Sequence, residues 1–175
     1  MSREAGSMAR DAVVGTIEVQ IAVMARNTEL LRRRSMSPGE LDRAAYLILR
    51  ALCTLGSADI NGLALVLGLD ASTVGRQVTG LVEEKLVTRS PAEDDRRRAV
   101  IVVSDEGRRL LDLTIASRRE RTTQLLSDWD VEDLQRFGEL LAHYNSAVSD
   151  RYMTGLKTVE AEPGARPGLQ GAEHV

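Results

Sequence analysis

Apolar side chains recur every three or four positions along most of the chain, the spacing that gathers them on one face of a helix. Residues 1–9 are small and polar, and we expect them to be disordered. A long helix is predicted from about residue 11, with an apolar face made of Val13, Ile17, Ile21 and Met24. Pro38 suits the first turn of a second helix over residues 38–54, whose buried face would hold Leu41, Ala45, Ile48 and Leu52.

The following segment predicts two short helices. The first covers residues 59–67 and is broken by Gly68. Asp70 can cap the second, over residues 71–85, because its carboxylate can accept a backbone N–H of the first turn. Two short helices joined by a glycine-containing turn form the helix-turn-helix pattern.

After Lys85 the apolar period changes from that of a helix to that of a strand. The runs LVTR and AVIVV predict two short strands, over residues 86–89 and 99–103, and the stretch PAEDDRRR between them would be a hairpin loop. An isolated hairpin is marginal in water, so this one must pack against the helix-turn-helix. The result is a winged helix.

Two long helices are predicted after the hairpin. Ser104 can cap the first, which carries acidic residues in its positive first turn and an inner face of Leu111, Ile115, Thr122, Leu125 and Trp129. Asp130 starts the second. Its apolar residues have a heptad-like spacing that favours a partner helix, namely Leu134, Phe137, Leu141, Tyr144 and Val148.

The predicted fold is therefore mainly α, a winged helix-turn-helix with a small β-hairpin wing and long terminal helices. The winged helix-turn-helix domain would span residues 37–104. Residues 10–36 and 105–153 would form a helical dimerisation region, because these helices are too apolar for a monomer of this size. Residues 156–175 are rich in Pro, Gly and acid, and we expect a disordered tail.

Composition narrows the function mainly by exclusion. The 175 residues suffice for one domain with a real core, and the net charge of −3 gives no sign of nucleic-acid binding. With Cys53 as the single cysteine, neither an internal disulfide nor a Cys-based metal cage can form. We expect no cofactor, and a cytoplasmic location, because the sequence shows neither a long apolar run nor a leader.

Three stretches together resemble the MarR family of bacterial transcription regulators, across roughly residues 11–153. They are LALVLGLDASTVGRQVTGLVEEKLV, DDRRRAVIVVSDEGRRL and LLSDWDVEDLQRFGELLAHY, and they occur in the order the family shows. The resemblance implies a homodimer whose first and last helices interleave. It also implies that two winged helices read a palindromic site in double-stranded DNA, and that a small molecule or an oxidant relieves repression.

The helix over residues 71–85 presents a polar side opposite its apolar one. Residues near the start of a recognition helix meet base edges in the major groove, where Arg76 could grip guanine and Gln77 adenine. Ser72 and Thr73 could donate to phosphates, and Thr79 lies on the same side. The alternative is an ordinary solvated face.

The charged hairpin loop could reach the neighbouring minor groove, where a narrow A·T tract concentrates negative potential and attracts arginine. The family resemblance implies that Asp95 pairs with Arg97 and fixes the loop, while Arg96 or Arg98 reaches the DNA backbone. The alternative is a mobile charged loop without a function.

Two positions depart from the family pattern. Lys85 stands where the family has glycine before the wing, and a non-glycine residue with positive φ costs about 1 kcal/mol there. Gly80 replaces a longer polar side chain on the recognition helix. We therefore expect moderate affinity with a large contribution from the wing.

The effector is less well defined by the sequence. Cys53 lies among leucines, which favours a buried and inert thiol, and the presence of only two histidines disfavours a dedicated metal site as the sensor. An organic anion or phenol remains, and Met24, Arg43 and Tyr46 could line its cleft. Each of these three residues could equally be ordinary packing or surface, and the protein could act without a ligand.

Two other functions compete with DNA binding. An enzyme is disfavoured because the sequence has no P-loop, no dinucleotide glycine pattern and no nucleophile–histidine constellation. A winged-helix adaptor that binds protein rather than DNA remains an alternative, because the recognition helix has few cations and the C-terminal third is acidic. Salt-sensitive binding to a specific duplex would distinguish the two.

Overall fold

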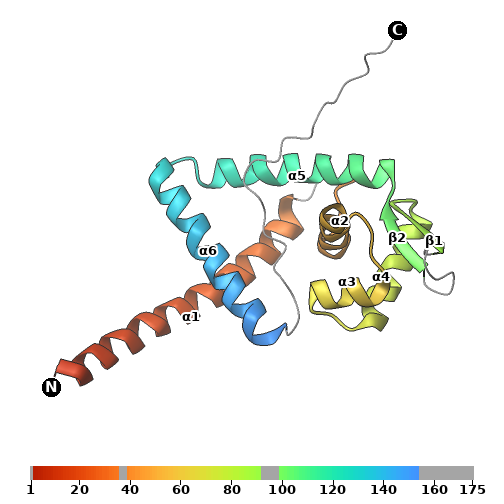
Figure 1. The fold of residues 1–175 in the computed structure, drawn as a ribbon. Coiled ribbons are helices and arrows are strands. Elements are labelled where there is room, and N and C mark those ends of the chain that lie inside the picture. Colours follow the sequence, from red (N-terminus) through yellow and green to blue (C-terminus); the bar gives the residue numbers. More distant parts are fainter. Residues whose placement is uncertain (1, 36–38, 92–98, 154–175) are drawn as a thin grey trace, which may run out of the picture. The chain divides into compact units, whose positions relative to one another are not determined.

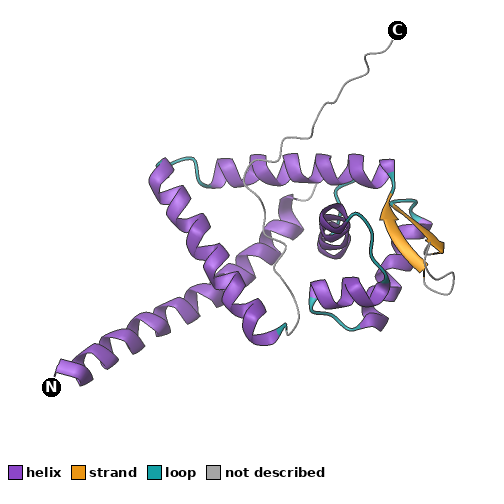
Figure 2. Cartoon of the chain, viewed as in Figure 1, coloured by secondary structure: helices purple, strands orange, loops and turns teal. Residues whose placement is uncertain are grey.

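The computed structural model of the chain describes residues 2–35, 39–91 and 99–153. These residues form two compact units, of which the first (residues 1–40) holds one helix and the second (residues 41–175) holds the rest. The elements, drawn in Figure 1 and coloured by type in Figure 2, are α1 (Ser2–Ser35), α2 (Arg43–Leu55), α3 (Ile60–Leu67), α4 (Ala71–Glu83), β1 (Val87–Pro91), β2 (Ala99–Val103), α5 (Asp105–Leu125) and α6 (Val131–Tyr152).

Helix α1 begins at Ser2, so the expectation that residues 1–9 are disordered is wrong for residues 2–9. The segment contains Glu, Ala, Met and Arg, which all favour helix, and Gly6 is not enough to stop it. The apolar residues predicted for this helix are mostly exposed, among them Val13, Val14 and Ile17.

Helix α2 begins later than the position of Pro38 predicted. Its N-cap is Asp42, whose carboxylate accepts a hydrogen bond from the Ala45 amide at 2.8 Å. This bond satisfies one of the amides that a helix start leaves without a partner, and Pro38 itself lies outside the described residues. Asp70 and Ser104 are N-caps as predicted. Asp59 and Asp130, predicted as the first residues of their helices, are the N-caps one position before them.

The core lies where α2, α3 and α4 meet the sheet and the start of α5. Its fully buried side chains are Ile48, Leu49, Leu52, Leu63, Val74, Val78, Val87 and Ile101. Val82 lies beside the buried Leu81 on α4 but is itself 37% exposed. Thr114 on α5 is fully buried, accepts from the Leu41 amide at 3.2 Å and donates to the Leu110 carbonyl at 2.8 Å.

The two strands pair antiparallel in the register Val87↔Val103 to Pro91↔Ala99, which confirms the predicted hairpin, although β1 extends past residue 89. Ile101 and Val103 of β2 point into the core. Ala58, in the segment before α3, adds a bridge to Ile101. The wing is therefore joined to the helix-turn-helix by both backbone and side chains, whereas its loop, residues 92–98, lies outside the described residues.

The end of α4 turns into the wing through Lys85, which has a φ of +62°. The Lys85 amide donates to the Val82 carbonyl at 3.0 Å, and the Leu86 amide donates to the Leu81 carbonyl at 2.8 Å. These two bonds make a Schellman motif, which needs a left-handed residue at the position of Lys85. The departure from glycine therefore leaves the backbone of this turn in the left-handed conformation that glycine favours.

Helices α5 and α6 leave much of their apolar surface uncovered. The later part of the inner face predicted for α5, including Thr122 and Leu125, is exposed, and no residue of α6 is buried. Trp129 and Phe137 meet edge to face, with ring centroids 5.3 Å apart. The heptad-like stripe of α6 is thus present as predicted, and four of its five residues are exposed, whereas Leu141 is half-buried.

Candidate nucleic-acid interface

Helix α4 separates an apolar side from a polar one. Val74, Val78 and Leu81 are buried against the core. On the other side Ser72, Arg76 and Thr79 are exposed, while Thr73 and Gln77 are half-buried. The structure therefore brings together on one helix the five residues that the sequence singles out for DNA reading.

A hydrogen-bond network occupies the start of α4 and is centred on Asp70. One carboxylate oxygen of Asp70 accepts from the Thr73 amide at 2.8 Å and from the Ser72 hydroxyl at 2.5 Å. The other oxygen accepts from the Thr73 hydroxyl at 2.6 Å. The Thr73 hydroxyl in turn accepts from Nη2 of Arg76 at 3.2 Å, so the network extends to the guanidinium.

This network keeps Asp70 charged. Hydrogen bonds from the Ser72 side chain, and then from the side chain and amide of Thr73, hold the pKa of the Asp70 carboxyl well below its usual range. Each bond favours the ionised form because it donates to a carboxylate oxygen. The recognition helix therefore starts with a fixed negative charge, which the sequence identified only as a cap.

The remaining polar residues of this side differ in their bonding. The Thr79 hydroxyl donates to the Gly75 carbonyl at 2.9 Å, one turn back along α4. Oε1 of Gln77 is buried and has no hydrogen-bond partner among the described residues. A buried acceptor without a partner costs free energy. A hydrogen bond to this oxygen from a donor outside the helix would remove that cost.

The predicted wing residues, Asp95, Arg96, Arg97 and Arg98, all lie outside the described residues. Within the described part of the wing, Arg89 is an exposed cation on β1. The sequence pattern did not single it out, although the alternation of VTRSP places it on the side of the strand opposite Thr88 and Ser90.

The three residues predicted to line an effector cleft belong to different compact units, so their grouping stays a prediction. Met24 belongs to α1 and therefore to the first compact unit. In the second unit, Arg43 is exposed and Tyr46 is half-buried, with the guanidinium carbon of Arg118 3.8 Å from the centre of its ring. A hollow in the second unit runs along α5 and is lined by Asp112, Ile115, Ala116, Arg119, Glu120, Thr123 and Gln124.

The prediction of a buried Cys53 is wrong, because this thiol is exposed. It lies in the last turn of α2, past the edge of the core that covers Leu49 and Leu52, and Leu55 in the same turn is also exposed. Nη1 of Arg108 lies 3.8 Å from the Cys53 sulfur. Cys53 is therefore not the buried core residue that the sequence predicted.

Two other kinds of feature are absent from the described residues. No group of three or more His, Cys, Asp or Glu side chains lies close enough together to hold a metal ion within those residues. None of the helices in the described ranges has the length and apolar character needed to cross a membrane.

Two helices joined by a tight turn and followed by a β-hairpin, with a polar outer side on the second helix, define a winged helix-turn-helix protein of the DNA-binding class. The sequence model of the MarR family matches residues 40–98. The HTH-type transcriptional regulator YxaD of Bacillus subtilis is 33% identical over 137 residues, which are 78% of this chain and 96% of that protein. The chain belongs to the MarR family of transcriptional regulators.

Solved structures show the same fold. A mutant MarR from E. coli complexed with operator DNA has a TM-score of 0.62 at 17% identity, over 74% of this chain and 93% of that one. PcaV from Streptomyces coelicolor, in complex with its natural ligand, has a TM-score of 0.61 at 22% identity, over 74% of this chain and 91% of that one.

Proposed function

We propose that this regulator is a homodimeric, ligand-responsive repressor that binds a palindromic operator. The observation that carries the proposal is the division of α4, whose apolar side is sealed into the core while Arg76 and its polar neighbours face outward. The E. coli neighbour was solved with operator DNA. In the proposed complex, α4 of each copy lies in the major groove, and the protein acts in the cytoplasm, where a bacterial operator lies.

Exposed apolar surface supports the dimer. Helix α1 exposes Val13, Val14 and Ile17, and α6 exposes Leu134 and Phe137 among others. Large apolar side chains exposed along a helix in this number are typical of an interface rather than of a monomer's exterior. Pairing with a second copy would cover it and would place two recognition helices for two half-sites.

The wing supplies the second part of the proposed interface. Arg96, Arg97 and Arg98 form a run of three positive charges in the sequence after α4, whereas α4 itself has one basic residue, Arg76. We expect the arginines to enter the minor groove or contact phosphates, with Asp95 orienting Arg97. Pro91 and Ala99, between which the loop runs in the sequence, are the last pair of the hairpin register.

The effector in this proposal is a small organic anion or a phenol. PcaV, a neighbour of the same fold, was solved with its natural ligand. Arg43 and Tyr46 lie on α2, where Tyr46 already receives the Arg118 guanidinium on its ring, and Met24 would join them from α1. A charge, a ring and an apolar group suit an aromatic anion.

The test is a titration of the duplex upstream of the protein's own gene, and of a random duplex, followed by fluorescence anisotropy over a salt series. The wild type is compared with the triple variant Arg96→Ala, Arg97→Ala, Arg98→Ala. A control triple variant, Arg109→Ala, Arg119→Ala, Arg136→Ala, removes the same charge from exposed positions on α5 and α6.

We expect the wing variant to bind the operator more weakly, with a salt slope flatter by about 0.9 for each phosphate that it no longer touches. The control variant should keep the wild-type slope. Equal effects of the two variants would contradict a role for the wing. Absence of binding to any duplex at any salt, including duplexes selected from the whole genome, would favour the protein-binding adaptor.

A further inference from the structure

The hydroxyl groups on the outer side of α4 are already used as donors. Ser72 and Thr73 both donate to Asp70, and Thr79 donates to the Gly75 carbonyl. A hydroxyl has one proton to donate, and a phosphate oxygen at neutral pH chiefly accepts. None of the three can donate to a DNA phosphate without first breaking a bond inside the protein.

Asp70 also changes the electrostatics at the start of the helix. The first turn of a helix attracts phosphate because its free amides and its dipole are positive there. Asp70 takes up the Thr73 amide and adds a full negative charge at the same end. A phosphate that approaches this turn therefore meets repulsion in place of attraction.

Asp130, the N-cap of α6, shows what capping alone requires. Its carboxylate accepts the Asp133 amide at 2.8 Å, and capping needs no more than such a bond. Asp70 makes the equivalent bond and binds two hydroxyls as well. One of these, that of Thr73, receives Nη2 of Arg76, so the additional bonds lead to the single basic side chain of α4.

Holding Arg76 matters because of how arginine reads DNA. Recognition of guanine uses two parallel hydrogen bonds from a planar guanidinium, which demands a fixed orientation. A freely rotating arginine binds any phosphate within reach, whatever the sequence. A guanidinium with one Nη anchored to Thr73 keeps the other nitrogen atoms available and loses less freedom when it meets a base.

We propose that Asp70 is a specificity-determining residue, which repels phosphate from the start of α4 and, through Thr73, orients Arg76 toward a base edge. The inference rests on the proposed function, because it assumes that α4 enters the major groove. It assigns Ser72 and Thr73 to holding the network together instead of binding phosphate. Asp70 thereby lowers the affinity for random DNA more than the affinity for the operator.

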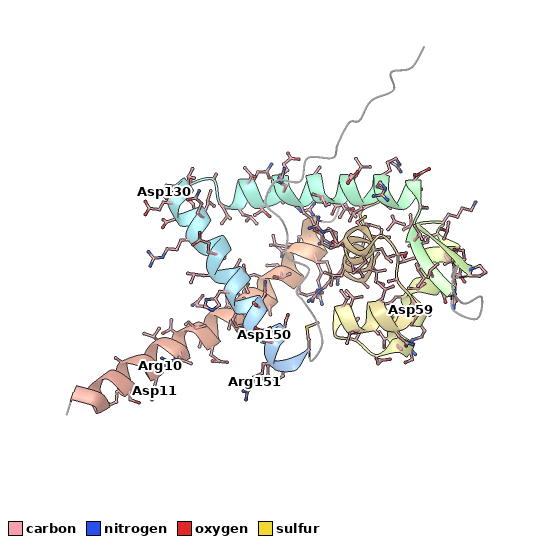
Figure 3. The ribbon with its side chains drawn as sticks, in the orientation of Figure 1. Arg10, Asp11, Asp59, Asp130, Asp150 and Arg151 are labelled. Carbon is pink, nitrogen blue, oxygen red and sulfur yellow. The ribbon has the colours of Figure 1, made fainter. Side chains whose placement is uncertain are left out.

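The test compares Asp70→Asn with Asp130→Asn. Asparagine also caps helices, so both variants lose one negative charge and keep a cap. Asp130 stands at the far end of α5 from the wing, away from α4 (Figure 3). A third variant, Thr73→Val, keeps the charge of Asp70 and removes the hydroxyl that links it to Arg76.

Affinities for a selected operator duplex and for a random duplex are measured by anisotropy over a salt series. We expect Asp70→Asn to bind random DNA about threefold more tightly per subunit, the factor for one unit-charge repulsion across about 6 Å of water, and about tenfold more tightly for the proposed dimer. Operator affinity should rise less, so the operator-to-random ratio falls. Thr73→Val should lower the ratio without a steeper salt slope, and Asp130→Asn should leave the ratio unchanged.

An unchanged ratio in Asp70→Asn and Thr73→Val would overturn the inference while wild-type operator binding still supports the proposed function. Equal weakening on both duplexes in Asp70→Asn would also overturn it, because that is the result of a damaged helix alone. If Asp70→Asn does not fold, Thr73→Val decides. If the wild type binds no duplex, both the inference and the proposed function fail.

Discussion

Lys85 shows how one residue fixes the direction in which the wing leaves the recognition helix. Its φ of +62° is imposed by the Schellman motif that ends α4, in which both the Lys85 and the Leu86 amides bond back to the helix. The Ser104 hydroxyl donates to the Lys85 carbonyl at 2.7 Å and ties this turn to the start of α5. The turn is thus held from both sides although lysine disfavours it.

Replacing Lys85 with glycine should therefore stabilise the protein by about 1 kcal/mol, the cost of a side chain in the left-handed region. The free energy of unfolding in urea measures the effect. Lys85→Ala is the matched control, because alanine has the same Cβ and should change stability little. A glycine variant no more stable than the alanine variant would contradict the account of the strain.

Single residues also mark the limit of what the sequence predicts. The caps Asp70 and Ser104 were predicted because a cap is a local feature, read from one residue and the helix after it. The exposure of Cys53 and the burial of Thr114 could not be predicted from the sequence. Both depend on which residues of other helices pack against them, Arg108 near Cys53 and Leu41 against Thr114. The bonds of Asp70 to Ser72 and Thr73 are local, and the spacing in DAST could have indicated them.

At the scale of elements, the wing and the start of α5 approach each other closely at Gly107. A Cβ on Gly107 would overlap the Leu86 carbonyl oxygen and lie 3.1 Å from Cγ1 of Val103. That carbonyl already accepts from the Ser104 amide at 3.1 Å and has no room to move away. The helix start after Ser104 therefore requires glycine so that α5 can approach the wing.

Gly107→Ala should destabilise the protein by about 3 kcal/mol through overpacking against backbone. Gly80→Ala is the matched control, because nothing lies within 4 Å of its Cβ in the middle of α4. That change should instead stabilise the helix by about 0.5–1 kcal/mol. Thermal and urea unfolding measure both variants, and similar effects of the two would argue against the close contact at Gly107.

The order of the elements followed from periodicity, whereas some boundaries did not. The change from a period of 3.6 to one of 2 located β2 correctly because Ile101 and Val103 alternate with less buried residues. In β1 only Val87 is buried, and the strand runs to Pro91, two residues past its predicted end. The starts of α1 and α2 were misplaced. Helix α1 begins at Ser2 because the residues before position 10 favour helix. Helix α2 begins after Asp42, which caps it, and not at Pro38.

At the scale of the whole molecule, the exposed apolar residues of α1 and α6 are the main feature that the single chain leaves without a structural role. The sequence predicted this excess because the stripes of the terminal helices are wider than one chain needs. It could not show what covers these residues, because an apolar stripe indicates that a packing partner is needed but does not identify the partner. The homodimer and the DNA contacts of the wing accordingly stay predictions.

The most direct test of the central claim is to select duplexes that bind the wild-type protein from a random library and to sequence them. A dimer with one recognition helix per half-site predicts an enriched inverted repeat, with half-site centres about one helical turn, or 10 bp, apart. Arg76→Ala should lose the preference for one base pair in each half-site. Enrichment of no sequence, or of a site without two-fold symmetry, would contradict the account.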